Sequence, residues 1–185
     1  MYLVLILSLL GQSLSHLDLV YQGTVRQVHD WDCGIACAET VLQWTGADPK
    51  EASLLNIITP GRPISFRILQ DYFDRNEVSA MGYRLTFDHV AYFLTENPGS
   101  PLLIHLDENG GHFALAFGMT PEGVIVADPA HGVHLVPKAD FQESWTGNVL
   151  YFPELSSLPG ALEAVETTLE RAWLLQGARR FKPAF

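Results

Sequence analysis

Positively charged side chains are scarce in this chain of 185 residues. It has 11 Lys and Arg against 21 Asp and Glu, which gives a formal net charge of −10 at pH 7. Nucleic acids and anionic membrane surfaces attract basic proteins, so this charge disfavours both as the main partner. We therefore expect a peptide or protein substrate and no nucleic acid as partner. A basic peptide would suit the negative charge best.

Cysteine is also scarce, with only Cys33 and Cys37. Four residues apart, the two thiols could close only a very short loop, so a structural disulfide is not expected. A zinc site is not expected either, because the pair lacks a second Cys pair or nearby His ligands. His131 and His134 fall in a predicted turn and strand, where a spacing of three places side chains on opposite faces. No metal and no cofactor are implied.

The apolar run at the N-terminus is too short to span a membrane comfortably, which takes ~20 residues. It reads MYLVLILSLL and has the length of a signal-peptide core, with Ser13-Leu14-Ser15 as a candidate cleavage site. However, no Lys or Arg precedes Arg26. Two interpretations follow. The chain is exported or membrane-associated through residues 1–15, or it is cytoplasmic and the run is a buried first strand.

The length and a hydrophobic content of 48% suit one domain with a good-sized core. We predict three parts. An apolar segment covers residues 1–22, a catalytic domain covers 23–153, and a linker with an amphipathic C-terminal helix covers 154–185. Such a helix packs against its own domain or binds a partner, and the former is the more common outcome. Its predicted apolar side consists of Leu162, Val165, Leu169 and Trp173.

The first half of the chain is predicted to be mostly helical after a strand near Leu17 to Tyr21. The helix from Cys33 to Trp44 has Asp32 as its expected N-cap, whose carboxylate would accept from the first-turn amides, and Gly46 as its stop. Cys33 would then lie at the positive end of the helix dipole, which favours a thiolate. Further helices are expected over 48–57, from Ser65 onward and over 87–94.

The second half changes to short apolar runs separated by turn residues, which indicates an antiparallel sheet. Helices first and strands afterwards predict an α+β fold. The expected strands are Pro101 to Leu106, His112 to Met119, Gly123 to Ala127, Gly132 to Val136 and Asn148 to Phe152.

Four side chains supply the parts of an enzyme with a cysteine nucleophile: Gln27, Cys33, His112 and Asp128. A thiol needs a base, a group that orients the base and donors for the oxyanion. His112 and Asp128 fall on strands expected to pair, as a triad requires. The side-chain NH₂ of Gln27 and the backbone N–H of Cys33 could donate to the oxyanion. Gly34, without a side chain, would let a substrate approach closely. Each residue also has an ordinary structural explanation, such as a buried thiol or a turn-capping aspartate.

The string Gln27-x5-Cys33-Gly34-x2-Cys37 is similar to the papain-like double-glycine peptidases, a bacteriocin-processing family usually found as N-terminal domains of peptide-exporting ABC transporters. Gly111-His112-Phe113 resembles the histidine motif of that family, and Asp128-Pro129-Ala-x-Gly132 its aspartate motif. Residues 141–150 resemble its closing segment. The resemblance runs from about Gln27 to Phe152.

The resemblance implies a papain-like cysteine peptidase that cleaves leader peptides after Gly-Gly. Cys33 would be the nucleophile, His112 the general base and acid, Asp128 the orienting carboxylate and Gln27 the oxyanion-hole side chain. We expect a stand-alone peptidase domain, because no phosphate-binding Gly-rich loop accompanies it, and therefore a separate peptide exporter as partner. The alternatives are a papain-like acyl or peptidyl transferase and a non-catalytic peptide-binding domain.

Overall fold

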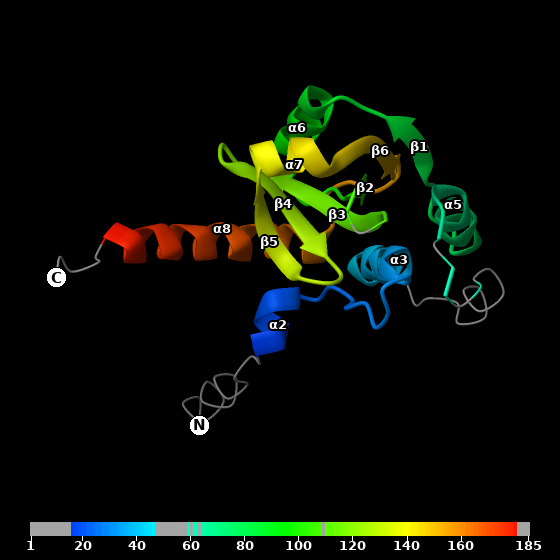
Figure 1. Ribbon diagram of the computed structural model, residues 1–185, viewed down its shortest axis with the longest axis horizontal. Helices are drawn as coiled ribbons and strands as arrows, with labels where there is room; N and C mark the ends of the chain where they lie inside the picture. Colours follow the sequence, from blue (N-terminus) through cyan, green and yellow to red (C-terminus); the bar gives the residue numbers. More distant parts are fainter. Residues whose placement is uncertain (1–15, 47–58, 60, 63, 109, 181–185) are drawn as a thin grey trace, which may run out of the picture.

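A computed structural model describes residues 16–46, 59, 61–62, 64–108 and 110–180. The centre of the protein is a six-stranded antiparallel sheet in the order β1-β6-β2-β3-β4-β5, with helices packed around it (Figure 1). The strands are β1 Met81–Arg84, β2 Leu102–Leu106, β3 His112–Met119, β4 Gly123–Asp128, β5 Gly132–Pro137 and β6 Trp145–Tyr151. The helices are α2 His16–Tyr21, α3 Cys33–Thr45, α5 Phe66–Arg75, α6 Phe87–Glu96, α7 Lys138–Ser144 and α8 Pro159–Arg180.

The strands at the centre of the sheet are apolar on both faces because helices cover both. Successive side chains of a strand point to opposite faces. Thus Phe113, Leu115 and Phe117 of β3 pack in the core with α3, α5 and α8, whereas Ala114 and Ala116 pack with α6 and α7. The chain therefore has two hydrophobic layers, and β3 lies between them.

The predicted α+β fold is confirmed, with most helices before residue 97 and most of the sheet after residue 101. Each expected strand of the second half is present, and β6 begins three residues earlier than expected, at Trp145. The helices expected from Ser65 onward and over 87–94 are α5 and α6, and each begins at a side-chain N-cap, Ser65 and Thr86 respectively. The helix expected over 48–57 lies outside the described residues.

Helix α3 forms where the sequence predicts it and ends at the predicted glycine. Gly46 has a left-handed φ of 73°, and its N–H donates to the carbonyls of Leu42 and Gln43. Trp44 in the last turn packs edge-on against Phe117, with ring centroids 5.2 Å apart. This packing fixes the helix against β3, and its first residue, Cys33, is fixed with it.

At the periphery one expectation is wrong, and two elements were not expected. The strand near Leu17 to Tyr21 is helix α2, because a short apolar run does not by itself distinguish strand from helix. Strand β1 was not expected, since all four of its residues are exposed at the edge of the sheet and give no apolar pattern. Helix α7 was also missed, because its seven residues bury only Phe141.

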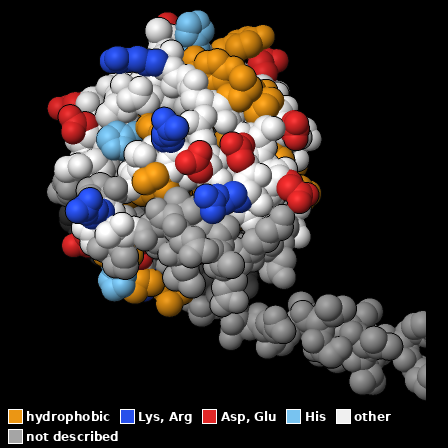
Figure 2. All heavy atoms as spheres, turned by 90° about the vertical axis from the view of Figure 1, so that its right-hand side faces the viewer, with side chains coloured by type: hydrophobic (Ala, Val, Ile, Leu, Met, Phe, Trp, Pro, Cys, Tyr) orange, Lys and Arg blue, Asp and Glu red, His pale blue; other side chains and the backbone are white. Residues whose placement is uncertain are grey.

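Strand β1 places hydrophobic side chains on the surface. Its Met81 and Tyr83 are 46% and 44% exposed. Figure 2 views the molecule from the right-hand side of Figure 1, where β1 and α5 lie, and shows a group of hydrophobic side chains near its upper border among charges of both signs. Charges of both signs therefore lie around the exposed hydrophobic side chains on this side of the molecule.

Helix α8 packs against its own domain, which confirms the commoner of the two expectations for the C-terminal helix. It contacts α3, β3 and β5. Its buried side chains are Ala161, Ala164, Val165 and Thr168, whereas Leu169 of the predicted apolar stripe is 42% exposed. Of the predicted stripe, Val165 is thus buried in the core and Leu169 is not, while the side chain of Trp173 lies outside the described part of the chain.

The expectation of export or membrane association through residues 1–15 is withdrawn. Among the residues that the structure describes, no helix is long and apolar enough to cross a membrane. The N-terminal segment itself lies outside those residues.

The structure also corrects the expected role of Gly34, which is buried and does not open the site to substrate. A Cβ at this position would lie 2.4 Å from Cγ2 of Ile64 and 3.1 Å from Cδ2 of Phe113. Gly34 is therefore required by the packing of α3 against β3 and the segment before α5.

We predict that Gly34→Ala lowers the free energy of unfolding by about 1–3 kcal/mol, because the new methyl group must displace the stiff, β-branched Ile64 or the Phe113 ring. Urea denaturation measures this loss. Gly82→Ala is the matched control, since its nearest neighbours would be 3.8 Å away. Equal stability of the two variants would contradict this account.

Candidate active site

Cys33 is the first residue of α3 and lies against the start of β3. It is only 4% exposed. The backbone N–H of Phe113 donates to its Sγ over 3.5 Å, and interaction with this thiol helps to raise the pKa of the His112 imidazole. The thiol and the imidazole, 79 positions apart in the sequence (112 − 33), are therefore adjacent in the fold.

His112 and Asp128 meet across the β3-β4 hairpin. Nε2 of His112 lies 3.0 Å from Oδ1 of Asp128, and the two side chains are 15% and 7% exposed. Since Nε2 faces the carboxylate, Nδ1 is left for the thiol of Cys33. The order thiol, imidazole, carboxylate is that of a cysteine triad.

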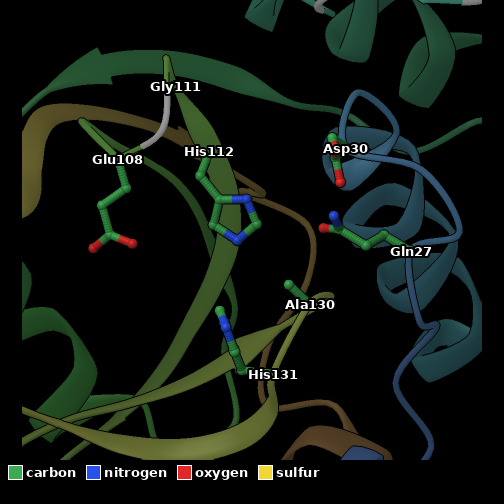
Figure 3. Close-up of a pocket in the computed structure, with 7 residues that line it drawn as sticks. All are labelled: Gln27, Asp30, Glu108, Gly111, His112, Ala130 and His131. Atoms are coloured by element: carbon green, nitrogen blue, oxygen red, sulfur yellow. The ribbon is translucent and has the colours of Figure 1, made fainter.

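Gln27 lies in the segment before α3 and is tied to the loop that follows Asp128. Its backbone N–H donates to the carbonyl of Pro129 over 2.9 Å. Its side-chain Nε2 donates to the carbonyl of His29 over 3.3 Å, while Oε1 is buried without a hydrogen-bond partner. In Figure 3 the carboxamide points toward the imidazole of His112. The structure thus brings all four predicted residues into one region.

Asp32 does not have the role that the sequence suggested. It precedes α3, but its carboxylate makes no cap hydrogen bond. It accepts instead from the backbone N–H groups of Val28, at 3.3 Å, and His29, at 3.1 Å. Its carboxylate therefore shapes the loop that carries Gln27 and does not occupy the first-turn amides of α3.

A pocket of about 490 Å³ opens beside His112. Figure 3 shows Asp30 and Glu108 on opposite sides of it, with His112 between them. Its lining residues are Gln27, Asp30, Glu108, Gly111, His112, Ala130 and His131. Two of these seven are carboxylates and none is Lys or Arg, so the pocket suits a neutral or basic peptide.

The environments of the imidazole and the carboxylate shift their pKa values in opposite directions. Burial alone lowers the pKa of His112, but hydrogen bonds to Asp128 and Cys33 and their negative charges raise it to about 10. Burial alone raises the pKa of Asp128, but the hydrogen bonds and charge of His112, with help from His131 and Ala130, hold it well below its usual range. At neutral pH the pair is an imidazolium and a carboxylate, and an imidazolium stabilises a neighbouring thiolate.

Cys37 lies one turn further along α3 and is 1% exposed. Burial raises the pKa of its thiol, and the negative charges of Cys33 and Asp128 raise it further. Cys37 is thus a core residue with an unreactive thiol.

His131 and His134 are closer together than the sequence suggested. Their rings are 6.4 Å apart, so they do not lie on opposite faces. Nδ1 of His134 faces the carbonyl of Gly132, and Nδ1 of His131 faces Asp128. Within the described residues, no three His, Cys, Asp or Glu side chains form a group that could hold a metal ion.

The contact between His131 and Asp128 was not predicted from the sequence. His131 was considered there only with His134, as a possible metal ligand. The signal was present in Asp128-Pro-Ala-His131, since an aspartate often accepts hydrogen bonds from residues two and three positions later. Ala130 and His131 both donate backbone N–H groups to Oδ1 of Asp128.

Residues 22–157 match the model of the peptidase C39 family, which is more than half of the chain. The chain belongs to this family. It is therefore a cysteine peptidase, and the resemblance seen in the sequence is confirmed. A peptide is its class of substrate. No curated protein sequence matches the chain.

Solved structures show the same fold. A double-glycine-motif protease from a PCAT transporter, solved with its leader peptide, has a TM-score of 0.60 and 23% identity over 70% of this chain and 89% of its own. The peptidase domain of Streptococcus ComA has a TM-score of 0.61 and 19% identity over 71% and 97%. An N-terminal C39-like domain from Vibrio parahaemolyticus has a TM-score of 0.53 and 15% identity over 68% and 97%. This chain therefore has the papain-like fold of these C39 peptidase domains.

We predict that His112 keeps its proton to a pH near 10 in the folded protein, since its folded pKa is raised above the ordinary 6.5. In histidine Cε1–H NMR spectra, the signal lost in His112→Gln should titrate near pH 10. Asp128→Asn removes the negative charge, so its His112 signal should titrate closer to about 6.5. A wild-type midpoint at or below about 6.5 would contradict the described pairing.

Proposed function

We propose that this C39 peptidase hydrolyses peptide bonds through a triad of Cys33, His112 and Asp128. The observation that carries the proposal is the 3.0 Å hydrogen bond between His112 and the buried Asp128, beside a Cys33 thiol that accepts from the backbone N–H of the next residue, Phe113. A buried carboxylate orients the imidazole and stabilises its charged form, and the imidazolium in turn stabilises the thiolate.

In the proposed reaction, Sγ of Cys33 attacks the carbonyl carbon of the substrate and forms a tetrahedral intermediate. The C–N bond then breaks, and His112 gives its proton to the leaving amine. A water molecule attacks the resulting thioester while His112 takes a proton from it. Cleavage of the C–S bond releases the carboxylic acid and restores the thiolate and imidazolium pair.

The side-chain NH₂ of Gln27 and the backbone N–H of Cys33 are the proposed oxyanion donors. Three facts support this role: Gln27 lines the pocket beside His112, its carboxamide is half-buried, and the Asp32 carboxylate leaves the first turn of α3 uncapped. Its present bond to the carbonyl of His29 is 3.3 Å long and therefore weak. The carboxamide can exchange this bond for the stronger one to a negatively charged oxygen.

We propose a leader peptide cleaved after Gly-Gly as the substrate. Cys33 is only 4% exposed, so a side chain next to the scissile carbonyl has little room. The PCAT protease solved with a leader peptide has the same fold, which supports this class of substrate. A peptide exporter is the proposed partner, since the solved double-glycine protease comes from a transporter. The proposed catalytic unit is 23–153, preceded by segment 1–22 and followed by 154–185 as linker and helix.

The proposal is tested with a set of peptides in which Gly-Gly is replaced by Gly-Ala, Ala-Ala or Gly-Leu. We expect cleavage after Gly-Gly, a rate that falls with each added side chain, and no cleavage by Cys33→Ala. Mass spectrometry of the products identifies the cleaved bond. Retained cleavage in Cys33→Ala, or a preference for Gly-Leu, would contradict the mechanism or the specificity respectively.

Two matched controls refine this experiment. Cys37→Ala should remain active, because the Cys37 thiol takes no part in the chemistry. Gln27→Ala should lower kcat by about 10²–10³-fold, the usual effect of losing one oxyanion donor, while Gln43→Ala on the exposed side of α3 should not.

Added hydroxylamine separates transfer from hydrolysis, since a transferase would give mainly the hydroxamate product.

A further inference from the structure

Asp128 is shared by two histidines that differ in exposure. Its Oδ1 lies 3.0 Å from Nε2 of His112, and its Oδ2 lies 3.1 Å from Nδ1 of His131. The His131 side chain is 73% exposed, whereas those of His112 and Asp128 are 15% and 7% exposed. One carboxylate therefore links the inner imidazole to an imidazole in contact with solvent.

We propose that His131 is a positioning residue of this peptidase, which holds the Asp128 carboxylate toward His112. The proposal rests on the proposed roles of His112 and Asp128 in the triad. His131 acts only through Asp128.

The positioning role follows from the hydrogen bonds of the carboxylate. The terminal torsion of an aspartate is broad and roughly two-fold, so a bond to one oxygen alone fixes it poorly. Oδ1 accepts from the backbone N–H groups of Ala130, at 2.7 Å, and His131, at 3.2 Å, besides facing His112. The His131 ring anchors the other oxygen, Oδ2. With both oxygens bound, the carboxylate plane is fixed relative to the ring of His112.

The groups that face His131 come from four parts of the chain. The ring of His134 in β5 is 6.4 Å away, and its Nδ1 faces the carbonyl of Gly132. Glu108, between β2 and β3, lines with His131 both the active-site pocket and a second one of about 310 Å³. Asp30, in the segment before α3, lines the former, while Phe141 and Ser144 of α7 line the latter and carry no charge.

His131 also lies in the wall of the active-site pocket, on the same side as Ala130 and below His112 in Figure 3. Its ring thus contacts Asp128 from the pocket side.

The test compares three variants. His131→Asn keeps an N–H donor near the position of Nδ1 but cannot take a proton, and His131→Ala removes both properties. His134→Ala is the matched control, because the Nδ1 of this adjacent imidazole faces the carbonyl of Gly132 and not the Asp128 carboxylate. The measurements are the rate of Cys33 alkylation by iodoacetamide as a function of pH and the NMR titration of His112, neither of which needs a substrate.

We expect the midpoint of the His112 titration to fall in His131→Ala and to keep its wild-type value in His131→Asn and His134→Ala. At neutral pH, His131→Ala should be alkylated about 3- to 10-fold more slowly, the size of effect expected for the loss of one typical hydrogen bond, and His131→Asn should match wild type. An unchanged His112 midpoint in His131→Ala, or equal losses of rate in the two His131 variants, would overturn the proposal. Failure to cleave any peptide would instead count against the proposed function alone, because both readouts here are independent of cleavage.

Discussion

The hydrogen bond between His112 and Asp128 is the interaction on which the site depends. The pairing of β3 with β4 places the first residue of one strand near the last residue of the other, so the hairpin itself holds the imidazole against a carboxylate. The same strand start donates the N–H of Phe113 to the Cys33 thiol. The start of β3 thereby fixes His112 relative to both Asp128 and Cys33.

The two-layer core explains why this strand terminus is rigid. Phe113 and Phe117 of β3 pack toward α3, while Ala114 and Ala116 pack toward α6 and α7. Because both faces are filled, β3 cannot shift without disturbing both layers. The position of Cys33 follows from the same packing, since α3 is fixed by Trp44 at its end and by the close approach of Gly34 near its start. The packing that stabilises the core therefore also sets the geometry of the site.

Much of this arrangement was predictable from the sequence, because the spacing of Gln27 from Cys33 and of His112 from Asp128, and the short apolar runs between turn residues, are local patterns. What the sequence did not predict depends on tertiary contacts. The carboxylate of Asp32 can accept from amides on either side of it, and the sequence does not show that Val28 and His29 are the ones bound. The need for glycine at position 34 comes from Ile64 and Phe113, far away in the chain. Strand β1 forms because β6 offers it an edge, although its own residues carry no apolar pattern.

In the proposed mechanism, a charged imidazole activates the Cys33 thiol. Burial, by contrast, inactivates the Cys37 thiol. The most direct test is the rate of iodoacetamide alkylation at each cysteine as a function of pH, resolved by mass spectrometry, in wild type and in His112→Ala. The account predicts fast alkylation of Cys33 at neutral pH, loss of this reactivity in His112→Ala, and slow alkylation of Cys37 in both. Equal reactivity of the two cysteines in the wild-type protein, or a Cys33 rate unchanged by removal of His112, would contradict it.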